Sequence, residues 1–213
     1  MSFKPKRPFT VVLFMMLFLG LGFFIFPVIW AVVSSFKGPQ EILRVPPSFL
    51  PDDLAYLANY AEVFVRSEFL RFIFNSFLLC IAAVSISLFF SALAGYGFAK
   101  FNFPLKEIFF FGIIGVLMVP FQSVAVPLFI SLQKMKLVDT FLGLLLPLMI
   151  SAFGVLLMRE GVAAIPDDYI DAARIDGSSE FRTFLSVILP MTRPSLAALA
   201  IIKFMWTWNE FFW

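Results

Sequence analysis

The sequence has no histidine, one cysteine and few charged residues: 16 Lys or Arg and 14 Asp or Glu among 213. Histidine is the commonest general base and metal ligand, so we expect neither catalysis, nor a metal site, nor a cofactor in this chain. Cys80 lies in an apolar run without a partner in the sequence, which excludes a disulfide framework. The net charge of +2 comes without a basic patch, so nothing indicates a nucleic-acid partner.

What the sequence does contain is apolar. Hydrophobic residues make up 61%, Phe alone occurs 31 times, and charged residues are 14%. A soluble domain is nearer to about 45–50% apolar and about 25% charged. The composition therefore predicts an integral membrane protein.

Five apolar segments are long enough to span a bilayer as helices, which takes about 20 residues. They cover residues 10–33, 72–99, 108–132, 140–158 and 194–213. The first is too long for a signal peptide, and no small-residue cleavage site follows "FPVIW". We therefore predict an all-α polytopic transmembrane fold, with an N-terminus of residues 1–9 and a single transmembrane domain of residues 10–213.

The last segment is still apolar at Trp213, whereas a membrane helix normally finishes with flanking charges or interfacial anchors. We therefore expect the sequence to be truncated at its C-terminus.

The distribution of Lys and Arg predicts the orientation. With the N-terminus in the cytoplasm, nine of these residues lie in cytoplasmic segments and six in external ones, as the positive-inside rule favours. Residues 34–71 then form an external loop. Residues 159–193 form a cytoplasmic loop that holds ten of the thirty charged residues.

This cytoplasmic loop reads as a helix, a glycine turn and a second helix. Pro166 suits the first helical position, and Gly177 is the residue type that closes helices in a left-handed conformation. Ser178 or Ser179 can cap the second helix, which ends at Pro190.

The first helix of the loop is too short to be stable alone. Ile165, Tyr169, Ala172 and Ala173 fall on roughly one side, and the two alanines allow close approach by another surface. This favours a docking element for another protein. An ordinary solvated loop is the alternative.

The stretch "DAARIDGSSEFRTFLSVILP" resembles the EAA loop of ABC importer permeases, which reads Glu-Ala-Ala, three residues, Gly, about nine residues, then Ile-x-Leu-Pro. The matching positions here are Asp171, Ala172, Ala173, Gly177, Ile188 and Pro190. Asp171 departs from the family's Glu, keeping the charge but shortening its reach. Residues 75–104, 136–147 and 203–213 resemble further parts of the carbohydrate-importing branch, so the resemblance covers nearly the whole chain.

The resemblance implies six spans, one more than the five found here. It also implies partners: a second permease subunit, expected to form a heterodimer, two cytoplasmic ABC ATPase subunits and an extracytoplasmic solute-binding protein. The EAA loop would be the coupling element that contacts an ATPase, with Arg174 and Asp176 beside the matched positions. The sequence itself has no G-x-x-x-x-G-K-[ST] phosphate loop, so ATP would be bound by another protein.

Polar residues inside two spans are candidates for the substrate path. Gln122 and Ser123 lie between Pro120 and Pro127, where we expect kinks. The fifth span carries Trp206, Trp208, Asn209 and Glu210, a combination of aromatic faces and polar groups that suits a sugar. Interfacial anchoring by Trp and hydrogen bonding between helices by Asn are the structural alternatives.

The interpretation is a permease subunit of an ATP-driven carbohydrate importer at the cell membrane. A non-sugar solute such as glycerol phosphate or a polyamine is the first alternative, with Lys203 as the one basic residue available in the path. An ion-coupled secondary transporter and a membrane scaffold are the others. In the external loop, Pro46, Pro47 and residues 52–64 would either meet the binding protein or cap the helices.

Overall fold

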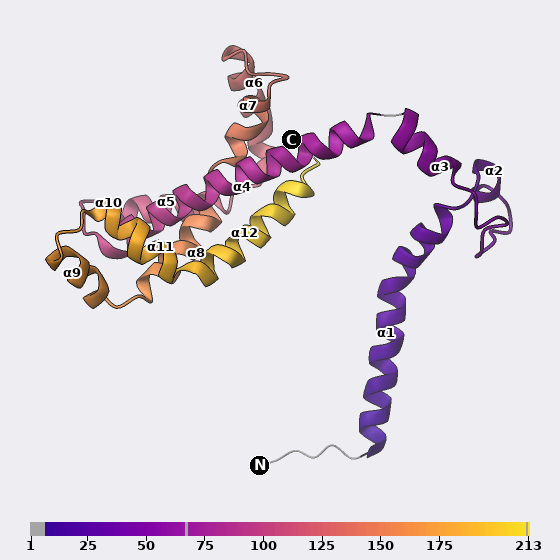
Figure 1. The fold of residues 1–213 in the computed structure, drawn as a ribbon, viewed down its shortest axis with the longest axis horizontal. Helices are drawn as coiled ribbons and strands as arrows, with labels where there is room; N and C mark the ends of the chain where they lie inside the picture. The colour runs from indigo at the N-terminus through magenta and orange to yellow at the C-terminus, as the bar shows by residue number, and fades with distance from the viewer. Residues whose placement is uncertain (1–6, 67, 212) are drawn as a thin grey trace. The chain divides into compact units, whose positions relative to one another are not determined.

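The computed structural model describes residues 7–66, 68–211 and 213, and every regular element in these ranges is helical. The all-α class predicted from the sequence is therefore confirmed. Most of the predicted cytoplasmic N-terminus, together with Ser67 and Phe212, lies outside the described residues. The chain divides into two units, residues up to 72 and residues from 73 onward (Figure 1).

The first unit contains the long helix α1 (Arg7–Ser34), two single-turn helices, α2 (Pro39–Ile42) and α3 (Ala58–Ala61), and a π-helical turn η1 (Glu62–Arg66). The segment between α1 and α3 is held by polar contacts. Lys37 is buried, donates to the carbonyl of Ser48 and lies 4.8 Å from the ring centre of Trp30. Asn59 donates to the carbonyls of Ser35 and Lys37 at 2.8 and 2.9 Å.

The second unit is built around the long helix α4 (Phe69–Lys100), whose first residues belong to the first unit. The helices that follow α4 are α5 (Lys106–Val116), α6 (Phe121–Lys134), α7 (Phe141–Leu145) with a 3₁₀ turn η2 (Leu146–Leu148), and α8 (Ala152–Ala163). The chain then forms α9 (Asp168–Ile175), α10 (Glu180–Thr183), a π-helical turn η3 (Phe184–Ile188), α11 (Leu189–Met191) and α12 (Arg193–Trp208).

Two helices, α1 and α4, are long and apolar enough to span a membrane unaided. Three further candidates are bent pairs: α5 with α6 at 99°, the segment 141–148 with α8 at 46°, and the segment 180–191 with α12 at 78°. The breaks lie where new helices start: Pro120 precedes α6, the Ser151 hydroxyl caps α8, and Pro194 lies in the first turn of α12. The described residues thus contain two to five candidate spans.

The third predicted span breaks over residues 117–120, at the first of the two prolines where kinks are expected. The second, Pro127, lies inside α6 without ending it. The helix of the fifth predicted span, α12, ends at Trp208 and not at Trp213. The side chain of Asn209 donates to the carbonyl of Met205 at 2.7 Å and closes the last turn.

The core of the second unit lies where α4, α8 and α12 converge with η3. It contains nine buried residues: Ala92, Tyr96, Met158, Val162, Ile165, Ile170, Phe184, Ile188 and Leu199. Glycine allows the helices to approach closely at this point. A Cβ on Gly95 would lie 2.7 Å from Cβ of Met158, and one on Gly154 would lie 2.4 Å from Oγ of Ser91. This core ends at the loop that carries α9 and α10 (Figure 1).

Candidate functional site

The polar loop folds into the helix, turn and second helix that its sequence predicts. α9 begins at Asp168, two residues after Pro166, with Asp168 and Asp171 in its first turn, where negative charge complements the helix dipole. Gly177 adopts φ +79°, the left-handed conformation expected of a residue that ends a helix. Of the two predicted caps, Ser179 is the one used: its Oγ accepts from the amide of Arg182 at 3.4 Å.

The face of α9 that packs on the protein is not the predicted one. Ile170 is 2% exposed and joins the core, together with Ile165 in the preceding turn. Ala173 is half-buried, whereas Tyr169 and Ala172 are exposed. The predicted side grouped Tyr169, Ala172 and Ala173 with Ile165. Ala173 lies three residues after Ile170 and shares its side of α9, whereas Ala172, two residues after Ile170, points nearly the opposite way. Ile170 is the largest aliphatic side chain on the side that packs on the protein, so it takes the buried place.

The opposite face of α9 is exposed and partly apolar. Tyr169 is 53% exposed and Ile175 is 86% exposed, with Ala172 between them. Asp176, the C-terminal cap of α9, is exposed on the same side. The result is an eight-residue helix anchored by Ile170 beneath and presenting aromatic, aliphatic and small side chains outward.

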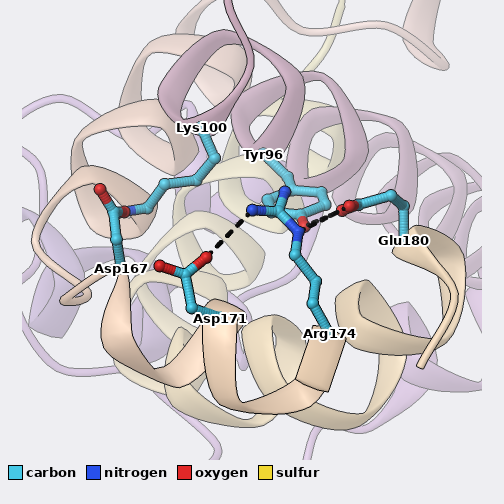
Figure 2. A network of polar contacts seen from close by, with 6 residues as sticks. All are labelled: Tyr96, Lys100, Asp167, Asp171, Arg174 and Glu180. Carbon is cyan, nitrogen blue, oxygen red and sulfur yellow. Dashed lines mark hydrogen bonds and ion pairs between the residues drawn. The ribbon is translucent and has the colours of Figure 1, made fainter. Parts of the chain in front are cut away.

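Arg174 links the two helices of the loop. Its Nε donates to Oε1 of Glu180 on α10 at 2.8 Å, and one terminal nitrogen donates to Oδ1 of Asp171 at 3.2 Å (Figure 2). The guanidinium thus lies between a carboxylate of α9 and a carboxylate of α10. Arg174 and Asp171, both predicted site residues, are brought together with Glu180, which the sequence analysis did not single out.

Two residues of α4 reach the same loop (Figure 2). The hydroxyl of Tyr96 donates to Oε2 of Glu180 at 2.8 Å. The amine of Lys100 donates to the backbone carbonyl of Ile165 and to the carboxylate of Asp167, just before α9. Tyr96, Lys100 and Glu180 are functional candidates that sequence reasoning missed. The available signal was the spacing of Tyr96 and Lys100, four residues apart at the end of an otherwise apolar helix, which places both on one face.

These contacts set the charge state of the loop. The hydrogen bond from Arg174, and after it the one from Tyr96, hold the pKa of Glu180 below its usual value. The hydrogen bond between Arg174 and Glu180 in turn raises the pKa of Arg174. Glu180 is therefore a carboxylate and Arg174 a cation throughout the physiological range, and the link between α9 and α10 is charged.

Two of the remaining predicted loop residues lie in the second helix. Ile188 is fully buried in η3 as part of the core, and Pro190 is half-buried in α11. Gly177 lies in the turn, and a Cβ there would meet nothing within 4 Å. These three positions shape the loop and its attachment, whereas Asp171, Ala172 and Asp176 lie on its surface.

The candidate substrate-path residues lie at the start of α6 and the end of α12. Gln122 and Ser123 are exposed in the first turn of α6. The rings of Phe121 and Trp213 meet edge to face at 5.8 Å, which brings the chain that follows α12 to the start of α6. Phe121 directly precedes Gln122 and Ser123, so Trp213 lies beside the first group of candidates.

Within α12 the two tryptophans do not share a face. Trp206 packs edge to face on Phe153 of α8 at 5.3 Å, whereas Trp208 stacks on Phe204 of its own helix at 5.7 Å. Trp208 lies with Ile201 and Met205 on the exposed side of α12, opposite the buried row of Leu199, Lys203 and Thr207. Asn209 caps the helix, and Glu210, which is exposed, follows it.

Comparison with known proteins identifies relatives over the whole chain. Residues 87–213 match the family described as binding-protein-dependent transport system inner membrane component. The arabinooligosaccharides transport system permease protein AraQ of Halalkalibacterium halodurans is 33% identical, over 98% of this chain and 77% of the relative. The sn-glycerol-3-phosphate transport system permease protein UgpE of Agrobacterium fabrum is also 33% identical, over 98% of this chain and 76% of the relative.

A solved structure shares the fold. The crystal structure of a bacterial ABC transporter involved in the import of the acidic polysaccharide alginate matches with a TM-score of 0.88 and 24% identity. The match covers 100% of this chain and 76% of that chain.

Proposed function

The chain belongs to the binding-protein-dependent transport system inner membrane components, the multi-pass permease subunits of ABC importers, and we propose that it conducts a carbohydrate in a pore shared with a second permease. The subunit is not catalytic, and family membership decides against the ion-coupled carrier and the scaffold. We further propose two separate ATPase subunits and an external binding protein as partners, and a cytoplasmic N-terminus.

The observation that carries this proposal is the outward face of α9. Tyr169, Ala172 and Ile175 are exposed on a helix whose other face is anchored by Ile170. Leaving apolar side chains in water forfeits roughly 25 cal/mol for each Å² that another surface would cover. A small residue at the centre of the face also lets a partner backbone come close. This face suits a cleft on the ATPase subunit, and α9 is the proposed coupling helix.

Two alanines of the loop provide a matched test. Ala172 lies at the centre of the outward face of α9, whereas Ala163 is exposed at the end of α8. Ala172→Arg places a long charged side chain in the proposed contact, and Ala163→Arg makes the same change outside it. We expect the ATPase subunit to copurify from detergent-solubilised membranes with the wild type and Ala163→Arg, and to be lost from Ala172→Arg. Copurification with both variants would refute α9 as the docking helix.

The carbohydrate is proposed from the exposed face of α12. Trp208 presents a partly exposed indole beside Met205, and flat aromatic surface is what a sugar ring stacks on. The phosphate-bearing alternative depends on Lys203, which is 8% exposed in the row that faces the chain's own core. A basic residue in that position is poorly placed to meet a solute, so a neutral oligosaccharide is favoured over a phosphate ester.

The test of the substrate uses the complete transporter in proteoliposomes with its binding protein. We expect arabinotriose to stimulate ATP hydrolysis and sn-glycerol 3-phosphate to leave it at the basal rate. Trp208→Ala and Trp206→Ala, which remove indoles that are 44% and 55% exposed, should each raise the arabinotriose concentration needed for half-maximal stimulation. Stimulation by the phosphate ester alone would overturn the carbohydrate proposal.

A further inference from the structure

We propose that the motion of the loop is delivered to the membrane through α4, by way of the side chains of Tyr96 and Lys100. This inference rests on the proposed coupling role of α9. In this proposal, two side chains of α4 hold the loop against that helix. The covalent connection from α10 to α12 would not transmit the motion by itself.

For the motion to be transmitted, α9 and α10 have to move together. The side chain of Arg174 links these two helices. Its guanidinium bonds to Asp171 on α9 and to Glu180 on α10, across the turn at Gly177. A glycine with φ +79° and open space around it is by itself a soft connection. The bridge by Arg174 stiffens the turn, so a displacement of α9 carries α10 with it.

Tyr96 fastens the linked helices α9 and α10 to α4. The side chain is 3% exposed, stacks on Phe184 with ring centres 5.9 Å apart, and meets Phe101 edge to face at 5.1 Å. Its ring therefore has a fixed position in the core against Phe184, and its hydroxyl reaches further, to Glu180 at the start of α10. A buried aromatic bearing one charge-assisted hydrogen bond is a rigid contact between the two elements.

Lys100 supplies a second fastening point one turn further along the same face of α4. Its side chain is 9% exposed, while that of Asp167 is 74% exposed. The amine bonds to the carbonyl of Ile165 and to Asp167, on the chain entering α9. The loop is thus held to α4 at both ends: at the entry to α9 by Lys100 and at the start of α10 by Tyr96.

The covalent route from α10 to α12 is less direct. It runs through the π-helical turn η3 and through Thr192, where the chain bends by 78° before α12 begins. π-Helical turns are irregular and a sharp bend diverts a push along a helix axis. The loop contacts α12 by side-chain packing, since Ile188 and Leu199 share the core. It contacts α4 through the hydrogen bonds of Tyr96 and Lys100 as well.

The experiment uses the complete transporter, with both permeases and ATPases, and follows backbone hydrogen exchange with and without ATP and vanadate. No transported solute is needed. In the wild type, we expect nucleotide to change exchange over α9 and over residues 87–100 of α4. Tyr96→Phe keeps the buried ring and removes the bond to Glu180. The nucleotide-dependent change should persist on α9 and be reduced on α4, where the bonds of Lys100 and the stacking on Phe184 remain.

Three further variants separate this role from a general loss of stability. Glu180→Gln, at an exposed loop position, keeps an acceptor for Tyr96 and should retain the α4 response in part; if Tyr96→Phe fails to fold, Lys100→Met tests the same loss. Glu107→Gln changes an exposed carboxylate at the start of α5 and should leave both responses at the wild-type level. An unchanged α4 response in a folded Tyr96→Phe or Lys100→Met transporter overturns the inference. Failure of the ATPase to copurify with the wild type would instead refute the proposed function.

Discussion

The approach of α4 to α8 at Gly95 gives the sharpest test of the fold. A Cβ at this position would lie 2.7 Å from Cβ of Met158 and 2.8 Å from the backbone nitrogen of Arg159. Carbon atoms in contact are normally about 3.5–4.0 Å apart. Because two of the three nearest atoms belong to the backbone and the third is a Cβ, no side-chain rotation relieves the overlap, and Gly95→Ala has to push the helices apart by about 1 Å.

The expected magnitude combines two opposing terms. Overpacking a close contact costs about 1–3 kcal/mol, whereas Ala is favoured over Gly inside a helix by about 1 kcal/mol. Gly97 lies two residues along in α4, and a Cβ there meets nothing within 4 Å, so Gly97→Ala keeps only the favourable term. We therefore expect Gly95→Ala to be less stable than Gly97→Ala by about 1–3 kcal/mol.

The chain carries its own reporter for this measurement. Cys80 is its single cysteine and is 2% exposed in α4, so its thiol reacts with a maleimide only when the helix opens. Thermal unfolding of detergent-purified chain, followed by this reaction, should give a midpoint lower for Gly95→Ala than for Gly97→Ala by about 2–4 °C for each kcal/mol. Equal midpoints for the two variants would show that α4 and α8 do not approach at Gly95.

Three further predictions concern the loop and the first unit. Gly177→Ala should lower the free energy of unfolding by about 1–2 kcal/mol through its positive φ alone, with Gly177→Asn nearer to the wild type, as measured by thermal unfolding. Because Arg174 and Tyr96 lower the pKa of Glu180, its stabilisation is complete above the unfolded value of about 4.3 and is lost as pH falls through the lower folded value. Glu180→Gln should therefore lower the unfolding midpoint at pH 7, and this difference should disappear below that window; a constant difference would contradict it. Lys37→Met, which removes a buried amine bonded to a loop carbonyl, should increase the rate of proteolysis in the segment between α1 and α3, and an unchanged rate would show that this bond does not order the segment.

The elements that the sequence predicts well are those governed by local chemistry. The left-handed Gly177, the capping Ser179 and the helix between Asp168 and Ile175 follow from residue preferences at helix ends. The helical class follows from apolar length alone, because a segment in lipid has to satisfy its own backbone. The family resemblance was likewise carried by contiguous motifs.

What the sequence could not provide depends on tertiary contacts. The choice of Ile170 as the buried residue of α9, and of Glu180 as the partner of both Arg174 and Tyr96, is made by elements far apart in the chain. By contrast, the break at residues 117–120 falls at Pro120, one of the two prolines where kinks are expected, whereas the other, Pro127, is tolerated within α6. The orientation in the membrane and the substrate-path residues stay predictions.

The broken third span has a consequence for how the protein is made. With about 1.5 Å of rise per residue, the 11 residues of α5 and the 14 of α6 are each shorter than the roughly 30 Å of a bilayer's hydrocarbon. At the break, the amides of Leu117, Met118 and Val119 bond three residues back, whereas residues 117–120 are exposed in the chain. Neither half is long enough to cross the bilayer as an independent segment. We therefore expect the pair to enter lipid together with a neighbouring helix such as α8, which α5 contacts, so that biogenesis of this region is a cooperative step.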